Sequence, residues 1–162
     1  MYYSVKNQTK LRFLDNNCKS LIKLHFIREM RGNFNMSWDF DLCDSVTKKV
    51  LETDEKHEIK GGTYCAGGTT EMTFNITYNY SDIINRKMEE LGIGEEDSYS
   101  YAYYLNGKTG AETIEPLKKI ISSLKDDVDE DYWKATEGNA KRALCGLLAF
   151  AQLRPDGIWS VY

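Results

Sequence analysis

The chain has 162 residues, and 41% of them are hydrophobic, which suits one domain with a packed core. Its net charge of −4 is uneven, because residues 1–35 carry +5 and leave −9 on the remaining 127 residues. An acidic body repels phosphate backbones, which argues against direct nucleic-acid binding and favours a partner protein with a basic surface. Solubility alone is the simpler explanation of such a charge.

The cysteines and the hydropathy pattern argue against metal-binding and membrane proteins. The four cysteines form no Cys-x-x-Cys pair and there are two histidines, so no metal site is predicted and no cofactor is expected. Reduced thiols and the lack of a signal-peptide pattern indicate a cytoplasmic protein. The longest apolar run, Ala143–Ala151, is too short to cross a membrane, and Cys145 within it is expected to be buried.

Residues 1–35 are predicted to be a basic N-terminal extension. Basic and apolar residues are mixed in Leu11–Met30, which is typical of a short strand followed by an amphipathic helix. Met36 begins a stretch that reads like a natural start of translation. We therefore expect residues 36–162 to form a single α+β domain, and we interpret residues 1–35 as sequence upstream of a native start at Met36.

The first half of the predicted domain is rich in strands. Alternating apolar residues predict a half-buried strand over Ser37–Cys43, and Val46–Leu51 is expected to return as its hairpin partner. The charged segment Thr53–Glu58 is expected to be exposed. Thr70–Tyr80 has apolar or aromatic side chains at every second position and predicts a long strand.

Three helices are predicted after these strands. One is expected over Ser81–Leu91 with Ser81 as its cap, and the capping-box pattern Thr109–Glu112 opens a second over Thr113–Leu124. Thr136 is expected to cap the last helix, Glu137–Leu153. The fold class that follows is α+β, a small antiparallel sheet packed against about three helices.

Aromatic residues bracket the last helix. Trp133 precedes it and Trp159 follows it, and we expect them to pack over the helix as a clasp. Arg154 is expected to stack on one of these rings or to pair with Asp156.

A glycine-rich segment is the first candidate site. Its two Gly-Gly-Thr steps expose backbone N–H groups that could hold a phosphate or a nucleotide. The candidate ligand-binding residues are Gly61, Gly62, Thr63, Gly67, Gly68 and Thr69. The segment lacks the Lys and the following helix of a Walker loop, so a glycine-rich hairpin or bulge is the simpler interpretation.

Two further segments are candidates for partner binding. The tyrosines at 99, 101, 103 and 104 predict an edge strand or extended loop that either contacts a partner or packs in the core. The acidic segment 126–131 lacks the central Gly of an EF-hand loop and predicts a solvated loop or a patch for a basic partner. The candidate partner-binding residues are Tyr101, Tyr103, Tyr104, Asp126, Asp127, Asp129, Glu130 and Asp131.

Recognisable catalytic motifs are absent from the sequence. It contains no Gly-x-Ser-x-Gly, no His-Glu-x-x-His and no Cys–His pair in a familiar setting. His57 and Glu71 could meet across the glycine-rich segment, but a single such pair is weak ground for a catalytic assignment. We therefore predict that the protein is not an enzyme, and we assign no catalytic residue.

Five stretches within residues 36–159 are distinctive when taken together: Met36–Asp39, Gly61–Glu71, Asn75–Tyr80, Gly107–Glu112 and Tyr132–Trp159. They resemble an uncharacterised family of small proteins encoded by phages and prophages of Firmicutes. The resemblance implies a small accessory protein of a mobile element that works in the cytoplasm of a bacterial host cell. It carries over no functional residue.

These observations lead to one principal hypothesis and one alternative. The first is a phage- or mobile-element-encoded, non-enzymatic binding protein that inhibits a host factor. The target would be a host protein such as a CRISPR nuclease or another nucleic-acid-binding defence component, which makes the chain a candidate anti-CRISPR protein. The alternative is a small-ligand protein that sequesters a nucleotide at residues 61–70.

Overall fold

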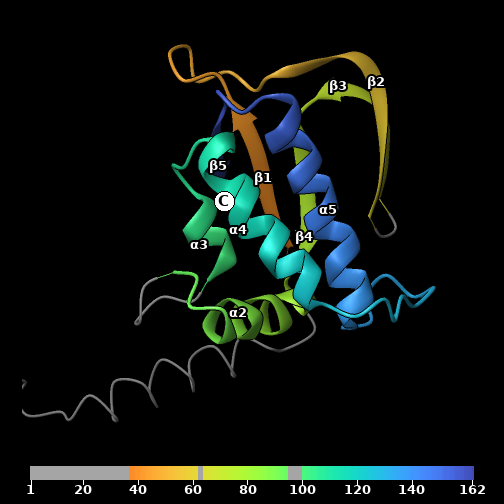
Figure 1. The fold of residues 1–162 in the computed structure, drawn as a ribbon. Helices are drawn as coiled ribbons and strands as arrows, with labels where there is room; N and C mark the ends of the chain where they lie inside the picture. Colours follow the sequence, from red (N-terminus) through yellow and green to blue (C-terminus); the bar gives the residue numbers. More distant parts are fainter. Residues whose placement is uncertain (1–36, 62–63, 95–99) are drawn as a thin grey trace, which may run out of the picture. The chain divides into compact units, whose positions relative to one another are not determined.

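The central sheet of the protein has three antiparallel strands. A computed structural model describes residues 37–61, 64–94 and 100–162, with the backbone alone at 57–61 and 64–68. In spatial order the strands are β4 (Thr73–Thr77), β1 (Ser37–Cys43) and β5 (Ile158–Val161) (Figure 1). The end of the described chain thus pairs with its beginning, with Leu42 opposite Trp159.

A long hairpin forms a second, separate sheet. It consists of β2 (Glu52–Gly61) and β3 (Tyr64–Glu71), which pair antiparallel with register shifts near His57. At Met72 the chain changes partner from the hairpin to the central sheet. The Met72 N–H donates to the Leu51 carbonyl, and its own carbonyl accepts the Leu42 N–H.

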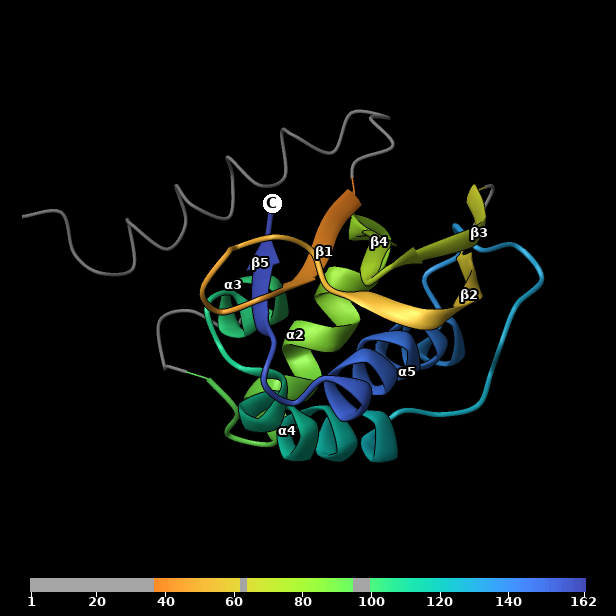
Figure 2. The ribbon, with the colours of Figure 1, turned by 90° about the horizontal axis from the view of Figure 1, so that it is seen from above.

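The helices of the described residues lie mainly on one side of the central sheet. They are α2 (Ser81–Glu90), α3 (Tyr101–Leu105), α4 (Gly110–Ser123) and α5 (Glu137–Leu153), and a short 3-10 helix, η1 (Tyr78–Tyr80), precedes α2. Figure 2 shows the strands of the central sheet side by side, with α4 and α5 on the same side of them. The predicted α+β class, a small antiparallel sheet packed against helices, is confirmed.

The hydrophobic core lies between this sheet and the helices. Phe40 and Leu42 of β1 are fully buried, and so are Leu144 and Leu147 of α5. Burial of each such side chain contributes roughly 1.5–3 kcal/mol. Trp159 is also buried, and its indole N–H donates to the Thr113 hydroxyl of α4 at 3.0 Å. Trp159 is therefore a core residue bonded to α4, and its part in a clasp over the last helix stays a prediction.

The strand predictions are confirmed only in part. Val46–Leu51 begins with a turn, in which the Asp44 carboxylate accepts the N–H groups of Val46 and Thr47, and forms no regular strand. Its end still returns beside β1, because Val50 bridges Cys43 and the Leu51 N–H donates to the Leu42 carbonyl. Thr53–Glu58 belongs to β2, and Asp54, Glu55 and Lys56 are exposed as expected. The long strand Thr70–Tyr80 is interrupted at Met72 and ends at Thr77.

The helix ends agree more closely with the sequence. Thr109 and Glu112 form both hydrogen bonds of the predicted capping box, but α4 begins at Gly110 rather than at Thr113. Thr136 caps α5, whose bounds match the prediction. Ser81 is the first residue of α2 rather than its cap. The predicted ion pair between Arg154 and Asp156 is present at 2.8 Å.

Cys145 is exposed rather than buried, which corrects the prediction for this thiol. Successive residues of an α-helix point about 100° apart. The core-facing side of α5 is taken by Leu144 and Leu147, so Cys145 is turned toward solvent. The described Cys43 is buried, and burial is the largest cause that raises its pKa.

Candidate interaction surface

The tyrosine-rich segment forms a short helix, α3, rather than an edge strand or extended loop. Tyr101 is 1% exposed and stacks on Phe40 with ring centroids 5.5 Å apart, and its N–H donates to the Asn85 side chain. Burial raises the pKa of Tyr101 far above its usual value. Tyr101 is therefore a core residue, and its prediction as a partner contact is wrong. Tyr99 lies outside the described residues.

Tyr103 points the other way and is 66% exposed. Its ring meets Trp38 edge-on at a centroid distance of 5.5 Å, and Trp38 contacts Tyr78 at 4.7 Å. We call these three residues the aromatic surface. Trp38 and Tyr78 are only partly buried, and Trp38 also packs against the core. The aromatic surface therefore brings together residues of β1, η1 and α3.

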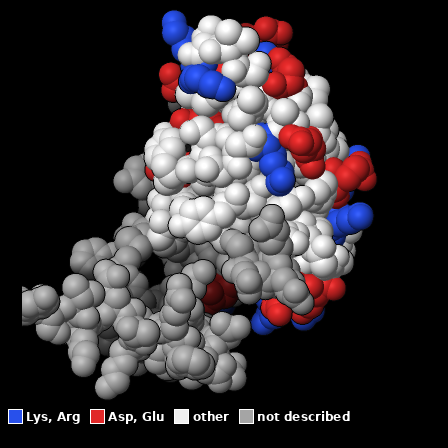
Figure 3. Space-filling view, turned by 90° about the vertical axis from the view of Figure 1, so that its left-hand side faces the viewer, with Lys and Arg blue, Asp and Glu red and all other residues white. Residues whose placement is uncertain are grey.

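Tyr104 is the next aromatic residue of α3, and its side chain points toward α4. It is partly buried, and the Lys108 ammonium lies 4.8 Å from the centre of its ring, a cation–π distance. Figure 3 shows the side of the molecule that carries α3 and β5, where uncharged residues form a continuous area with charged residues above it and to its right.

Sequence reasoning missed two of the three members of the aromatic surface. Alternation assigned Trp38 and Tyr78 to the buried faces of strands. The ends of antiparallel strands lie beside each other, however, and Ser37 pairs with Thr77, so both rings reach the rim of the core. Burial raises the pKa of Tyr78, and the neighbouring Tyr103 and Asp39 raise it further. The signal that could have identified the pair is the position of each aromatic residue at a strand end.

The acidic segment has mainly internal contacts. Asp126 forms an ion pair with Lys141 at 2.7 Å, and Asp127 accepts the N–H of Gly138, the second residue of α5, at 2.8 Å. Asp129 forms an ion pair with Lys134, which lowers the pKa of Asp129. Carboxylates at this end of a helix are favoured by the unpaired N–H groups and the helix dipole. Asp131 accepts the Trp133 N–H, whereas Glu130 is exposed.

Asn139 holds the same segment from inside α5. It is 5% exposed, its side-chain oxygen accepts the Asp129 N–H, and its amide donates to the carbonyls of Asp131 and Lys134. We call Lys125–Thr136, with these contacts, the α5 cap segment. Its acids stabilise a helix start, and their contact with a partner remains a prediction.

The glycine-rich segment forms most of a hairpin. Gly61 ends β2, and Gly67 and Gly68 lie inside β3, with Gly67 opposite Glu58. A strand directs its N–H groups sideways to a partner strand and does not converge them on an anion. The Thr69 hydroxyl accepts the Glu71 N–H. Gly62 and Thr63 lie outside the described residues, so the hairpin interpretation is confirmed only for the flanking strands.

The register of the hairpin also separates the one catalytic pair considered from sequence. His57 lies opposite Thr69, and Glu71 lies opposite Glu52. The two residues therefore do not face each other across the ladder.

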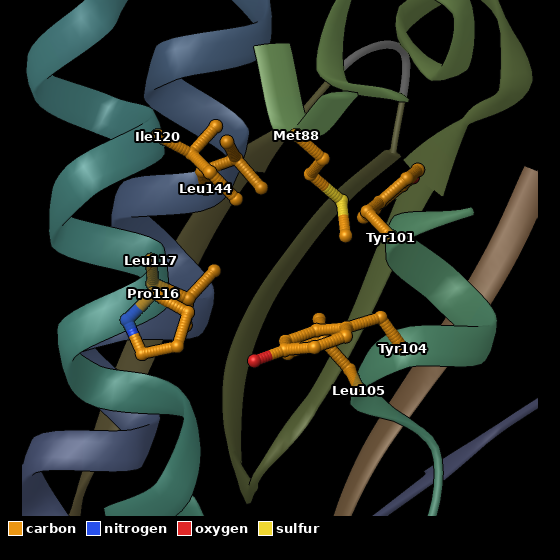
Figure 4. Close-up of a pocket in the computed structure, with 8 residues that line it drawn as sticks. All are labelled: Met88, Tyr101, Tyr104, Leu105, Pro116, Leu117, Ile120 and Leu144. Atoms are coloured by element: carbon orange, nitrogen blue, oxygen red, sulfur yellow. The ribbon is translucent and has the colours of Figure 1, made fainter. Parts of the chain in front are cut away.

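A small apolar recess lies between α2, α3, α4 and α5 (Figure 4). The Tyr104 hydroxyl points across it toward Pro116, and Met88 and Leu144 line its opposite walls. The enclosed space of the recess is about 10 Å³, room for roughly one water molecule. Small-molecule sites usually enclose roughly 300–1,000 Å³ and carry a few convergent polar groups. Its size and apolar lining do not favour a catalytic or nucleotide site here.

Comparisons with protein-family models, curated proteins and solved structures found no match. Among the described residues, no three His, Cys, Asp or Glu side chains gather closely enough to hold a metal ion together. Within the same residues, no helix combines the length and the apolar character that crossing a membrane requires.

Proposed function

We propose that this protein is a non-enzymatic binding protein of a phage or other mobile element that inhibits a host factor in the bacterial cytoplasm. The observation that carries the proposal is the aromatic surface, where Tyr103 is 66% exposed and rests edge-on against Trp38. The target class is a host defence protein with a basic surface, such as a CRISPR nuclease. The charge of −9 on residues 36–162 is complementary to such a surface.

The geometry of the aromatic surface suits protein contact. Trp38 belongs to the central strand β1, and Tyr78 follows β4 directly in η1. Tyr103 lies on α3 against Trp38. Rings held by packing lose little side-chain freedom on binding, and a few such Tyr and Trp residues often carry most of the affinity of an interface. Edge-to-face ring pairs also contribute about 0.5–1.5 kcal/mol to their own arrangement.

Tyr103→Ala tests the proposal in the full chain. We expect the tagged wild-type protein to co-purify with one host protein in stoichiometric amount, and the variant to bind that protein at least ~30-fold more weakly, the effect of losing about 2 kcal/mol at a hot spot. Tyr103 is exposed, so the fold should persist. Val46→Ala, which changes another exposed apolar side chain (84% exposed), is the matched control and should bind like the wild type.

Two results would contradict this function. Equal binding by the Tyr103→Ala variant would remove the aromatic surface from the interface. A protein that captures no host protein but carries a nucleotide, detected by mass spectrometry after denaturation, would favour the ligand hypothesis at residues 61–70.

A further inference from the structure

The outer face of β1 carries two aspartates that the proposed function leaves unassigned. Side chains alternate across a strand, so Asp39 and Asp41 lie on the face opposite the buried Phe40 and Leu42, with Cα atoms roughly 7 Å apart. This spacing places two carboxylates side by side at the centre of the three-stranded sheet.

Asp41 has a hydrogen-bonding atom without a partner. It is only 8% exposed, and its Oδ2 accepts the Tyr162 hydroxyl at 2.8 Å. Its Oδ1 is buried and accepts no hydrogen bond. Buried carboxylate oxygens are nearly always hydrogen-bonded, because leaving one unpaired forfeits the bonds it made to water. Asp41 therefore has hydrogen-bonding capacity that the described residues do not fill.

Asp39 is held in place beside it by neutral groups. Its Oδ1 accepts the Asn75 amide at 2.6 Å, and the same amide donates to the Ser37 hydroxyl at 2.7 Å. Among residues 37–61, 64–94 and 100–162, no Lys or Arg forms an ion pair with Asp39 or Asp41. The two carboxylates are thus positioned without a described cation between them.

We propose that the outer face of β1 binds an arginine side chain of the partner protein, with its guanidinium donating to the carboxylates of Asp39 and Asp41. This inference rests on the proposed function, because it identifies the chemistry of the same partner. A guanidinium is planar, carries five N–H donors and can bridge two carboxylates, whereas an ammonium is a compact point charge. Tyr162, 63% exposed and bonded to Asp41, offers an aromatic ring beside the site on which a guanidinium can stack.

The proposed arginine site and the aromatic surface lie at the same end of β1 but on opposite faces of the strand. Asp39 follows Trp38, so the two side chains point to opposite sides, and the charge of Asp39 contributes to the raised pKa of Tyr78. A partner that covers this end of the sheet can contact the aromatic rings and place an arginine over the carboxylates. Apolar anchors beside a buried charged contact are a common arrangement in protein interfaces.

The test is an NMR titration of the full chain with N-acetyl-arginine methylamide. We expect binding with a Kd on the order of 1 mM, which suits a ligand of this size, and shifts in the signals of Asp41 and Tyr162. N-acetyl-citrulline methylamide has nearly the same shape without the charge and should produce no saturable shifts. Asp41→Asn should weaken arginine binding at least ~10-fold, whereas the exposed Asp54→Asn is the matched control and should leave it unchanged.

Further variants keep the test decisive if Asp41→Asn fails to fold. Asp39→Asn should weaken binding several-fold, and Tyr162→Phe should retain it because both carboxylates remain. Equal binding of the citrulline compound, or wild-type affinity in both aspartate variants, would overturn the proposal. Saturable shifts of the same signals with CaCl2 or MgCl2, and none with arginine, would overturn it in favour of a metal site.

The outcome is separable from that of the proposed function. A host protein that is captured through Tyr103 with unchanged affinity by Asp41→Asn would support the binding function and reject the arginine site. Arginine binding without any captured host protein would support the site and reject the inhibitor function.

Discussion

Two acidic regions of this protein differ in what their carboxylates contact. In the α5 cap segment, Asp126 and Asp129 pair with lysines, and Asp127 binds the first turn of α5. On the outer face of β1, Asp39 and Asp41 contact only neutral groups among the described residues, and one buried oxygen of Asp41 has no partner. The acids of the α5 cap segment are closer together in the sequence, but more of them are paired within the protein. An acidic residue can be judged available for a partner only when its contacts within the protein are known.

The largest expected effect tests whether the α5 cap segment is structural. A Cβ atom on Gly138 would lie 2.4 Å from the Val128 nitrogen and 2.5 Å from the Asp127 carbonyl carbon, both backbone atoms. Gly138→Ala should therefore destabilise the protein by about 2–3 kcal/mol despite the better helix propensity of alanine. Urea denaturation measures this change. Cys145→Ala, on the exposed side of the same helix, should change stability by less than about 0.5 kcal/mol.

If Gly138→Ala is as stable as the Cys145→Ala control, the α5 cap segment does not pack on α5. The acids of the segment would then be free for a partner, and the contrast between the two regions would fail.

The second prediction probes the β1 face through Tyr162. Its hydrogen bond to Asp41, together with the nearby negative charge, raises the pKa of Tyr162 to about 12. Asp41→Asn should lower this pKa toward the ordinary value of about 10, because the phenol no longer donates to a carboxylate. Tyr-selective 13C NMR across alkaline pH measures the titration, with Tyr162→Phe to assign the signal. A Tyr162 titration that is the same in Asp41→Asn and Asp54→Asn would show that Asp41 does not hold the hydroxyl.

The smallest expected effect concerns the surface ion pair of Asp129 with Lys134. Lys134 is the first cause of the lowered pKa of Asp129 in the folded state. A depressed carboxyl pKa contributes stability that is present above the unfolded value of about 3.9 and is lost as the pH falls through the lower folded value. Lys134→Met should therefore reduce the loss of stability between about pH 4 and pH 2, measured by urea denaturation at each pH. A pH dependence identical to the wild type would mean that the pair does not form in solution.

The sequence predicted the caps of α4 and α5 correctly because their cause is local. The Thr109 and Thr136 hydroxyls accept hydrogen bonds from N–H groups three residues later, and Glu112 bonds back to Thr109. Both partners of each bond therefore lie within one short stretch of sequence. Strand predictions were less accurate because pairing is non-local. Thr53–Glu58 lacks an apolar face and forms a strand through β3, and Thr70–Tyr80 is divided where its partner changes.

The candidate surface was predictable only in part. A tyrosine-rich segment indicated aromatic contacts, and Tyr103 is exposed as a contact surface requires. Tyr101, two residues earlier, is buried because the segment is helical and turns that side chain toward Phe40. Trp38 and Tyr78 joined the surface through the register of β1 and β4, which the separate segments do not reveal.

By itself, the sequence determined the α+β class, the caps of α4 and α5, and an acidic body, because periodicity, capping and charge depend on nearby residues. Tertiary structure alone decided which acids are neutralised, which tyrosine is exposed and which aromatic rings meet. Those outcomes depend on residues distant in the chain, as in the approach of Gly138 to Asp127 and of Tyr162 to Asp41. Such contacts exist only once strands and helices have packed.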